Sequence, residues 1–140
     1  MTYYVRYALV DPNPIRLSEI KKGLCLVNPS YTIDADLLVF EDEEYGQIRI
    51  SKQGDILFTS DLELMKRFAE RKENSAFLLA ALQKVRSVVV VQVIWSRGQS
   101  ETWQVIEGMF NWLMENRAGL LMDEDGSFYY DLAEPVTCIM

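Results

Sequence analysis

The sequence predicts an α+β fold with a mostly antiparallel sheet, and three observations carry this prediction. Residues 87–96 are a run of valine, isoleucine and tryptophan with almost no polar face, which is typical of a strand covered on both faces, or nearly so, in the middle of a sheet. Helical hydrophobic patterns flank this run on both sides. The chain opens in the order strand, helix, strand, strand, as a ferredoxin-like core does. We therefore expect a ferredoxin-like βαββ-containing sandwich with its helices on one face.

Length and charge limit the class of protein. The chain has 140 residues, of which 49% are hydrophobic, so it is long enough to bury a core as a single domain over residues 1–140, with residues 132–140 as a loosely attached C-terminal tail. A net charge of −7 argues against nucleic acid and against anionic membrane surfaces as partners. No apolar run approaches the ~18 residues that a membrane span needs.

The cysteine pattern and the first residues predict a cytoplasmic protein. The two cysteines, Cys25 and Cys138, are far apart in a chain without histidine, which is neither a zinc pattern nor a disulfide framework. We interpret both as buried or incidental thiols in a reducing compartment. Residues 1–10 contain no basic segment followed by a long apolar core, so no signal peptide is expected.

The first half of the chain is expected to form a strand, a short helix and a hairpin. Residues 2–10 are aromatic and β-branched, and Pro14 then opens a helix that ends near Gly23. Residues 31–40 predict a second strand. This strand is expected to pair, across an acidic turn, with the alternating residues 45–51.

The middle of the chain predicts helices before the central strand. Residues 56–58 suggest a short strand, and Ser60 with Glu63 has the form of a capping box that opens a helix. A polar patch interrupts the helical stripe, which favours two helices, or one bent helix, with the second half, residues 76–85, deeply buried. The central strand then covers residues 88–95.

The last third predicts a long helix followed by a hairpin. The helix begins at Ser100 and buries a broad face, and Gly119 is interpreted as its left-handed cap. Residues 120–122 and 127–130 then form two strands around an acidic turn. The stripe that defines the helix consists of Trp103, Ile106, Phe110 and Leu113.

Two acidic segments are candidate sites. Asp123 and Asp125 lie two apart on a turn, with Asp131 beyond it, and carboxylates in this spacing can share a hard cation such as Mg²⁺ or Ca²⁺. The remaining ligands of an EF-hand are absent, and Asp-Gly is also a common hairpin turn, so a plain turn is the alternative. Glu43 and Glu44 end the densest run of charge, which suits a basic partner or a solvated loop tip.

Aromatic residues gather in the C-terminal third and are the other candidates. Trp103, Trp112, Tyr129 and Tyr130 are either core residues or anchors of a protein interface, where Trp and Tyr are enriched. The sequence contains no histidine base, no serine or cysteine in a recognisable nucleophile elbow, and no glycine-rich phosphate loop. We therefore expect neither an enzyme nor a cofactor.

The C-terminal third also resembles a group of small uncharacterised bacterial proteins. The resemblance covers residues 92–131 and is carried by Gln-Val-Ile-Trp at 92–95, by Trp112-Leu113, and by residues 119–131, which contain Gly-Leu, Asp-Gly and Phe-Tyr-Tyr-Asp. Ser127 stands where the pattern has an acidic residue or glycine. Some of these acidic proteins are thought to be immunity-type proteins that neutralise toxins. The resemblance carries over no functional residue.

These observations favour a cytoplasmic, non-enzymatic module that binds another protein, and the resemblance implies the immunity type. The alternative is a divalent-metal or small-ligand protein that uses Asp123, Asp125 and Asp131. Homodimerisation through a sheet edge or through the last helix is a third hypothesis. The sequence does not identify the protein partner.

Overall fold

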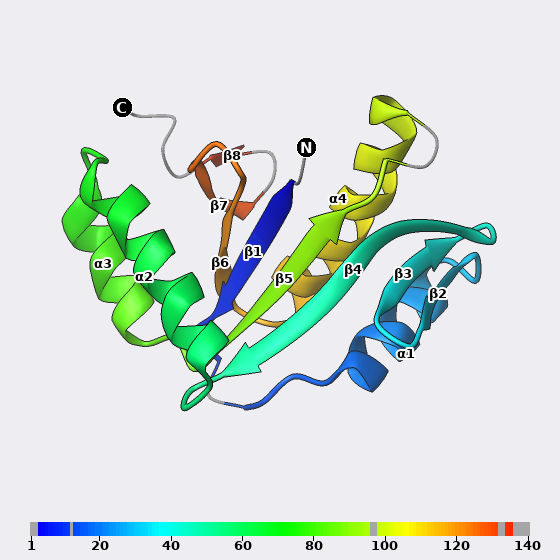
Figure 1. Ribbon diagram of the computed structural model, residues 1–140, viewed down its shortest axis with the longest axis horizontal. Helices are drawn as coiled ribbons and strands as arrows, with labels where there is room; N and C mark the ends of the chain where they lie inside the picture. Colours follow the sequence, from blue (N-terminus) through cyan, green and yellow to red (C-terminus); the bar gives the residue numbers. More distant parts are fainter. Residues whose placement is uncertain (1–2, 12, 96–97, 132–133, 136–140) are drawn as a thin grey trace.

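A computed structural model describes residues 3–11, 13–95, 98–131 and 134–135, and these residues form one antiparallel sheet of eight strands with helices on both sides (Figure 1). The strands are β1 (Tyr4–Leu9), β2 (Tyr31–Asp34), β3 (Leu37–Phe40), β4 (Glu43–Lys52), β5 (Ser87–Val93), β6 (Gly119–Met122), β7 (Phe128–Asp131) and β8 (Glu134–Pro135). The helices are α1 (Leu17–Val27), α2 (Ile56–Glu70), α3 (Ser75–Gln83) and α4 (Gln99–Asn116).

The α+β class is confirmed, but the ferredoxin-like topology is not. The sheet order is β2-β3-β4-β5-β1-β6-β7-β8, and every neighbouring pair is antiparallel. A simple ferredoxin-like core separates its first two strands by one strand. Here β3, β4 and β5 all lie between β1 and β2, because the chain makes a three-stranded meander before it returns to the centre.

Helices cover both faces of the sheet, so the expectation of helices on one face is wrong. Val89 and Val91 of β5 pack on the side of α1 and α4, whereas Val88 and Val90 pack on the side of α2 and α3. Side chains alternate along a strand, so an almost unbroken valine run must bury both of its faces. The expectation of a strand covered on both faces is confirmed for β5, which lies between β4 and β1.

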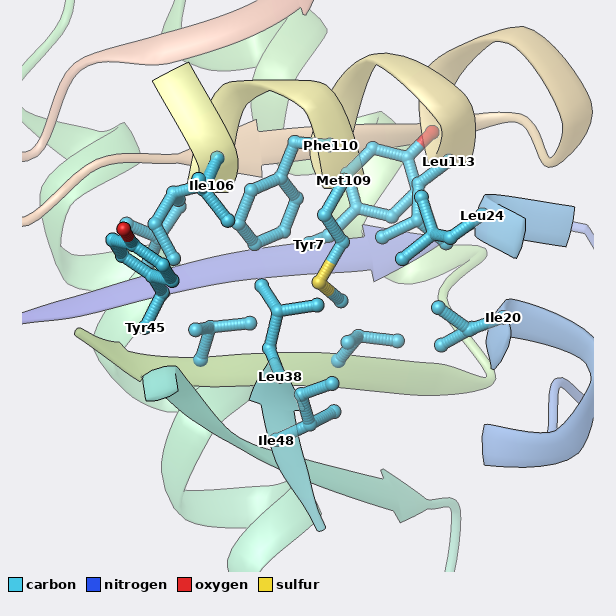
Figure 2. Packing of buried hydrophobic residues seen from close by; sticks show 14 of the residues in the cluster. Tyr7, Ile20, Leu24, Leu38, Tyr45, Ile48, Ile106, Met109, Phe110 and Leu113 are labelled. Atoms are coloured by element: carbon cyan, nitrogen blue, oxygen red, sulfur yellow. The ribbon is translucent and has the colours of Figure 1, made fainter. Parts of the chain in front are cut away.

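The larger core lies between the sheet and the pair α1 and α4 (Figure 2). Trp112 of α4 packs so closely on α1 that a Cβ at Gly23 would lie 2.1 Å from its ring. Gly23 therefore stands inside α1 and does not end it. The labelled core residues are Tyr7, Ile20, Leu24, Leu38, Tyr45, Ile48, Ile106, Met109, Phe110 and Leu113.

Residues 56–58 are the first turn of α2 and not a strand, so the predicted helix start at Ser60 is wrong. A tight turn through Gly54, at φ 105°, delivers the chain into the helix, and Asp55 Oδ2 accepts a hydrogen bond from the Lys52 N–H at 2.9 Å. Two helices are confirmed in this region. However, α3 is not deeply buried, since only Leu78 and Leu82 of the helix are buried.

The predicted strand over residues 31–40 is two strands joined by a turn. Ala35, at φ 55°, begins a two-residue turn between β2 and β3. Glu41 and Asp42 both have positive φ values, 50° and 65°, and join β3 to β4. Two consecutive residues in this conformation match the twist of a hairpin, so the hairpin between β3 and β4 is confirmed.

The hairpin of β6 and β7 is also confirmed, with Gly126 at φ 86° in its turn. Gly119 is not a helix cap. It begins β6, where a Cβ would lie 2.5 Å from the Ala8 carbonyl oxygen. Of the predicted tail, Glu134–Pro135 pair with β7 and the other residues lie outside the described part of the chain. None of the helices described is long and apolar enough to cross a membrane.

Candidate functional site

A cavity of about 250 Å³ lies between α4 and the sheet. Three residues that the sequence singles out, Trp103, Asp123 and Tyr129, meet in its lining together with Glu107. Its apolar floor is formed by Val5, Ile106, Phe110 and Leu121.

Regular secondary structure brings these side chains together. Trp103, Glu107 and Phe110 are spaced i, i+4 and i+7 on α4, and that spacing places them on one face of the helix. Leu121 of β6 pairs directly with Tyr129 of β7, so both point to the same side of the sheet. Asp123 follows the last residue of β6, at the edge of the cavity.

Three aromatic rings form a cluster next to this cavity, and one of them, Trp103, lines it. The Tyr3 ring lies edge-on to Trp95 and to Trp103, with ring centroids 5.8 and 5.2 Å apart, and the two indoles are 5.6 Å apart. Trp95 is 37% exposed, so the cluster reaches the surface. We call Trp95, Trp103, Glu107, Asp123 and Tyr129 the aromatic–acidic surface.

Two carboxylates of this surface differ in how much of their hydrogen-bonding capacity is used. Asp123 Oδ1 accepts hydrogen bonds from the Tyr3 hydroxyl at 2.5 Å and from the Glu124 N–H at 2.8 Å. Within the described residues no hydrogen bond uses Asp123 Oδ2, and Glu107 forms neither a hydrogen bond nor an ion pair. Glu107 is exposed and lines the cavity. The surface therefore presents acceptors that its own donors do not fill.

The carboxylates of this surface affect the pKa values of Tyr3 and Tyr129. Burial raises the pKa of Tyr3 above its ordinary value, and the hydrogen bond to Asp123 raises it further. Burial also raises the pKa of Tyr129, with the charges of Asp123 and Asp125 as further causes. Burial disfavours any charge, whereas the charges of Asp123 and Asp125 disfavour a tyrosinate anion and favour a cation.

Two of the three predicted metal ligands already accept hydrogen bonds. Asp125 Oδ1 accepts one from the Ser127 N–H at 2.9 Å, and Asp123 Oδ1 accepts those of Tyr3 and Glu124. In the part of the chain that the structure describes, no group of three or more His, Cys, Asp or Glu residues is arranged to hold a metal ion. The side chain of Asp131 lies outside that part, so the metal site stays a prediction.

The other candidates do not line this cavity. Trp112 packs on α1 beside Gly23, and Glu43 and Glu44 begin β4 after its hairpin turn. The side chain of Tyr130 lies outside the described residues. Cys25, interpreted as a buried or incidental thiol, is exposed, whereas Cys138 also lies outside the described part.

Sequence reasoning missed Glu107 and Tyr3. Glu107 follows Trp103 by one helical turn, which is the signal that places a carboxylate beside an indole. No local signal marks Tyr3, because its contacts are with Trp95, Trp103 and Asp123, all distant in the sequence.

Comparison with known proteins adds no relative, since no protein family, no curated protein and no solved structure matches the chain.

Proposed function

We propose that this protein is a protein-binding module and that its aromatic–acidic surface takes a lysine or arginine side chain of a basic partner. One observation carries the proposal. The carboxylates of Glu107 and Asp123 face the same cavity as the rings of Trp103 and Tyr129. A cation held between carboxylates and aromatic faces gains from ion pairing and from the ring quadrupoles together.

The size of the cavity favours a side chain over a free ligand. At about 250 Å³ it is below the range of roughly 300–1,000 Å³ that is usual for drug-sized ligands. One inserted side chain fills such a space, while the surrounding partner surface covers Trp95. Tryptophan and tyrosine in this position are the residue types that act as interface hot spots.

Charge supports the same kind of partner. The net charge of −7 attracts a basic protein over a distance, which raises the rate of association and makes it depend on salt. The resemblance to immunity-type proteins fits this proposal, because an acidic protein that neutralises a toxin is an acidic interaction module. The identity of the toxin does not enter the proposal.

Capture of a partner by matched variants tests this function. The tagged protein serves as bait in lysate from its source organism, beside Glu107→Gln and the control Glu115→Gln. Both glutamates are exposed on α4, but only Glu107 lines the cavity. We expect a basic protein to be retained in stoichiometric amount by the wild type and by Glu115→Gln, and roughly tenfold less by Glu107→Gln.

Asp123→Asn provides the second arm. Asparagine keeps an oxygen that can accept a hydrogen bond from the Tyr3 hydroxyl. The variant therefore removes the negative charge and preserves the hydrogen bond to Tyr3. Together with Glu107→Gln it is expected to abolish capture, and 0.5 M salt is expected to release the partner from the wild type. Equal capture by all variants, capture of an acidic protein, or no stoichiometric partner would overturn the proposal.

A further inference from the structure

A second cavity, of about 550 Å³, lies on the opposite side of the sheet. We infer that it binds the carboxylate or phosphate group of a small polar ligand through Arg6 and Arg49. We call it the arginine groove. Its lining consists of Tyr4, Arg6, Asp36, Gln47, Ile48, Arg49, Leu57, Val90 and Gln92.

The register of the strands builds the groove. Arg49 of β4, Val90 of β5 and Arg6 of β1 lie directly opposite one another across the sheet. Gln47 and Gln92 form the next row in the same way. The two arginines therefore flank one valine on a rigid surface, with side-chain amides beside them. Rigid placement of donors reduces the entropy lost when a ligand binds.

The arginines share a single carboxylate. Asp61 of α2 accepts from Arg6 Nε at 3.2 Å through Oδ1 and from Arg49 Nη1 at 2.9 Å through Oδ2. The Arg6 side chain is only 12% exposed, and its guanidinium lies over the Tyr4 ring at 5.3 Å. A second hydrogen bond, at 3.4 Å, joins Arg49 Nη2 to Asp61 Oδ1.

Arg6 thus keeps most of its donors unused. A guanidinium has five N–H donors, and within the described residues only Nε of Arg6 makes a hydrogen bond. Both terminal nitrogens of this largely buried group are left for a ligand or for water. Two parallel N–H groups match the two oxygens of a carboxylate or a phosphate, and such bidentate pairs are the strong ones.

Arg117 shows what a purely structural buried arginine does in this fold. Its Nε donates to Asp11 at 2.8 Å, its Nη1 donates to both carboxylate oxygens of Glu19, and its Nη2 donates to the Asn13 carbonyl. One cation there meets two carboxylates and a carbonyl. In the arginine groove Arg6 and Arg49 share the carboxylate of Asp61, and the carboxylate of the lining, Asp36, accepts from Gln47 and, among the described residues, from neither arginine.

The polar groups at the edge of the groove indicate which hydrogen-bonding groups the rest of the ligand has. Asp36 Oδ2 accepts from Gln47 Nε2 at 3.0 Å, so this carboxylate lies at the edge and is already engaged. A ligand with an anionic group at Arg6 and Arg49 and hydrogen-bond donors toward Asp36 and Gln92 matches both ends. The net charge of −7 repels a simple anion, so affinity has to come from the local geometry.

Thermal shift and calorimetry with inorganic phosphate and with citrate test this site. Sodium chloride at matched ionic strength separates binding from screening. We expect phosphate, citrate or both to raise the melting temperature of the wild type more than chloride does, because a ligand of the folded state stabilises it. A response to phosphate alone identifies a phosphate ester as the ligand class, and a response to citrate alone identifies a carboxylate.

Matched variants assign the effect to the groove. Arg49→Gln removes the more exposed arginine and is expected to weaken the affinity about tenfold or more. Arg86→Gln removes an exposed arginine from another part of the surface and is expected to leave the affinity unchanged. Asp61→Asn removes the competing carboxylate and is expected to raise the affinity. The inference is overturned if neither anion raises the melting temperature more than chloride does. It is also overturned if Arg49→Gln binds the anion with the same affinity as the wild type and the control Arg86→Gln.

Discussion

The two faces of the sheet bury polar groups in opposite ways. On the side of α1 and α4, the carboxylate of Asp123 is held by a neutral tyrosine hydroxyl and a backbone N–H. On the side of α2 and α3, the carboxylate of Asp61 is held between two guanidinium groups. Neighbouring residues of β1 serve the two sites, since Val5 lines one cavity and Arg6 the other. One strand therefore contributes to two sites, of which one is lined by Glu107 and Asp123 and the other by Arg6 and Arg49.

The charged groups at a site can therefore differ in sign from the net charge of the whole chain. The aromatic–acidic surface has the same sign as the net charge of −7, whereas the arginine groove places two guanidinium groups beside Asp61 and Asp36. Alternation along the strand separates the two sites by the thickness of the sheet. The surfaces are expected to act independently, so that loss of one site leaves the other unchanged.

The largest expected effect on stability comes from the charge of Asp61. Its carboxylate is buried between the two arginines, so Asp61→Asn leaves two cations without a counter-ion and is expected to lower the free energy of unfolding by about 3–5 kcal/mol. Urea denaturation measures this change. Glu63→Gln, on an exposed position of the same helix, is the control and is expected to change stability by less than about 0.5 kcal/mol.

The same change from aspartate to asparagine at Asp123, on the side of α1 and α4, is expected to have a smaller effect. Asp123→Asn keeps an acceptor for the Tyr3 hydroxyl and strands no cation, so a loss of only about 1 kcal/mol is expected in the same denaturation experiment. If Asp61→Asn and Asp123→Asn cost the same, the two carboxylates are not held in different ways and the contrast between the faces fails.

Two adjacent leucines of β6 compare the packing of the two faces. Leu120 and Leu121 are both almost fully buried, but Leu120 packs with α2 and α3 while Leu121 borders the 250 Å³ cavity. Truncation of a buried leucine usually costs roughly 2–5 kcal/mol. We expect Leu120→Ala to cost about 1 kcal/mol more than Leu121→Ala in urea denaturation, because Leu121 has fewer contacts to lose. A greater cost for Leu121→Ala would contradict this.

The smallest expected effect concerns alkaline pH. Burial raises the pKa of Tyr31 to about 12, and its hydroxyl donates to the Val105 carbonyl at 2.8 Å on the side of α1 and α4. The unfolded tyrosine titrates near pH 10, so the stability that neutral Tyr31 contributes is complete below pH 10 and is lost between pH 10 and pH 12.

Stability measured against pH for the wild type and Tyr31→Phe tests this assignment. The variant is expected to lose about 1 kcal/mol at neutral pH with the hydrogen bond, and then to decline less steeply between pH 10 and pH 12. Parallel curves for the two proteins would show that Tyr31 does not contribute to the alkaline loss.

The sequence predicts local features well where one strand or helix decides them. The valines of β5 predict burial on both faces, and the polar residue Gln92, which interrupts them, lines the arginine groove. The stripe of α4 likewise brings Trp103 to the cavity. The spacing of side chains along one element is enough for each of these predictions.

The pairing of residues that are distant in the chain could not be predicted from the sequence. Asp61 of α2 is buried against Arg6 of β1 and Arg49 of β4. The pattern of residues 60–63 predicts a helix start but contains no information about these distant partners. The order of the strands is also unmarked, because β1 could pair with any apolar strand as far as its own residues show. The aromatic cluster around Tyr3 was missed for the same reason.

The central place of β1 has a consequence for how the chain folds. β1 precedes both of its neighbours in the chain by a long stretch of sequence, since they are residues 87–93 and 119–122. During translation it therefore remains an apolar strand with both edges open until most of the chain has left the ribosome. Such distant pairing slows folding, because long loops must close before the contacts form. Among the described strands β1 therefore becomes fully paired only after β6 has formed.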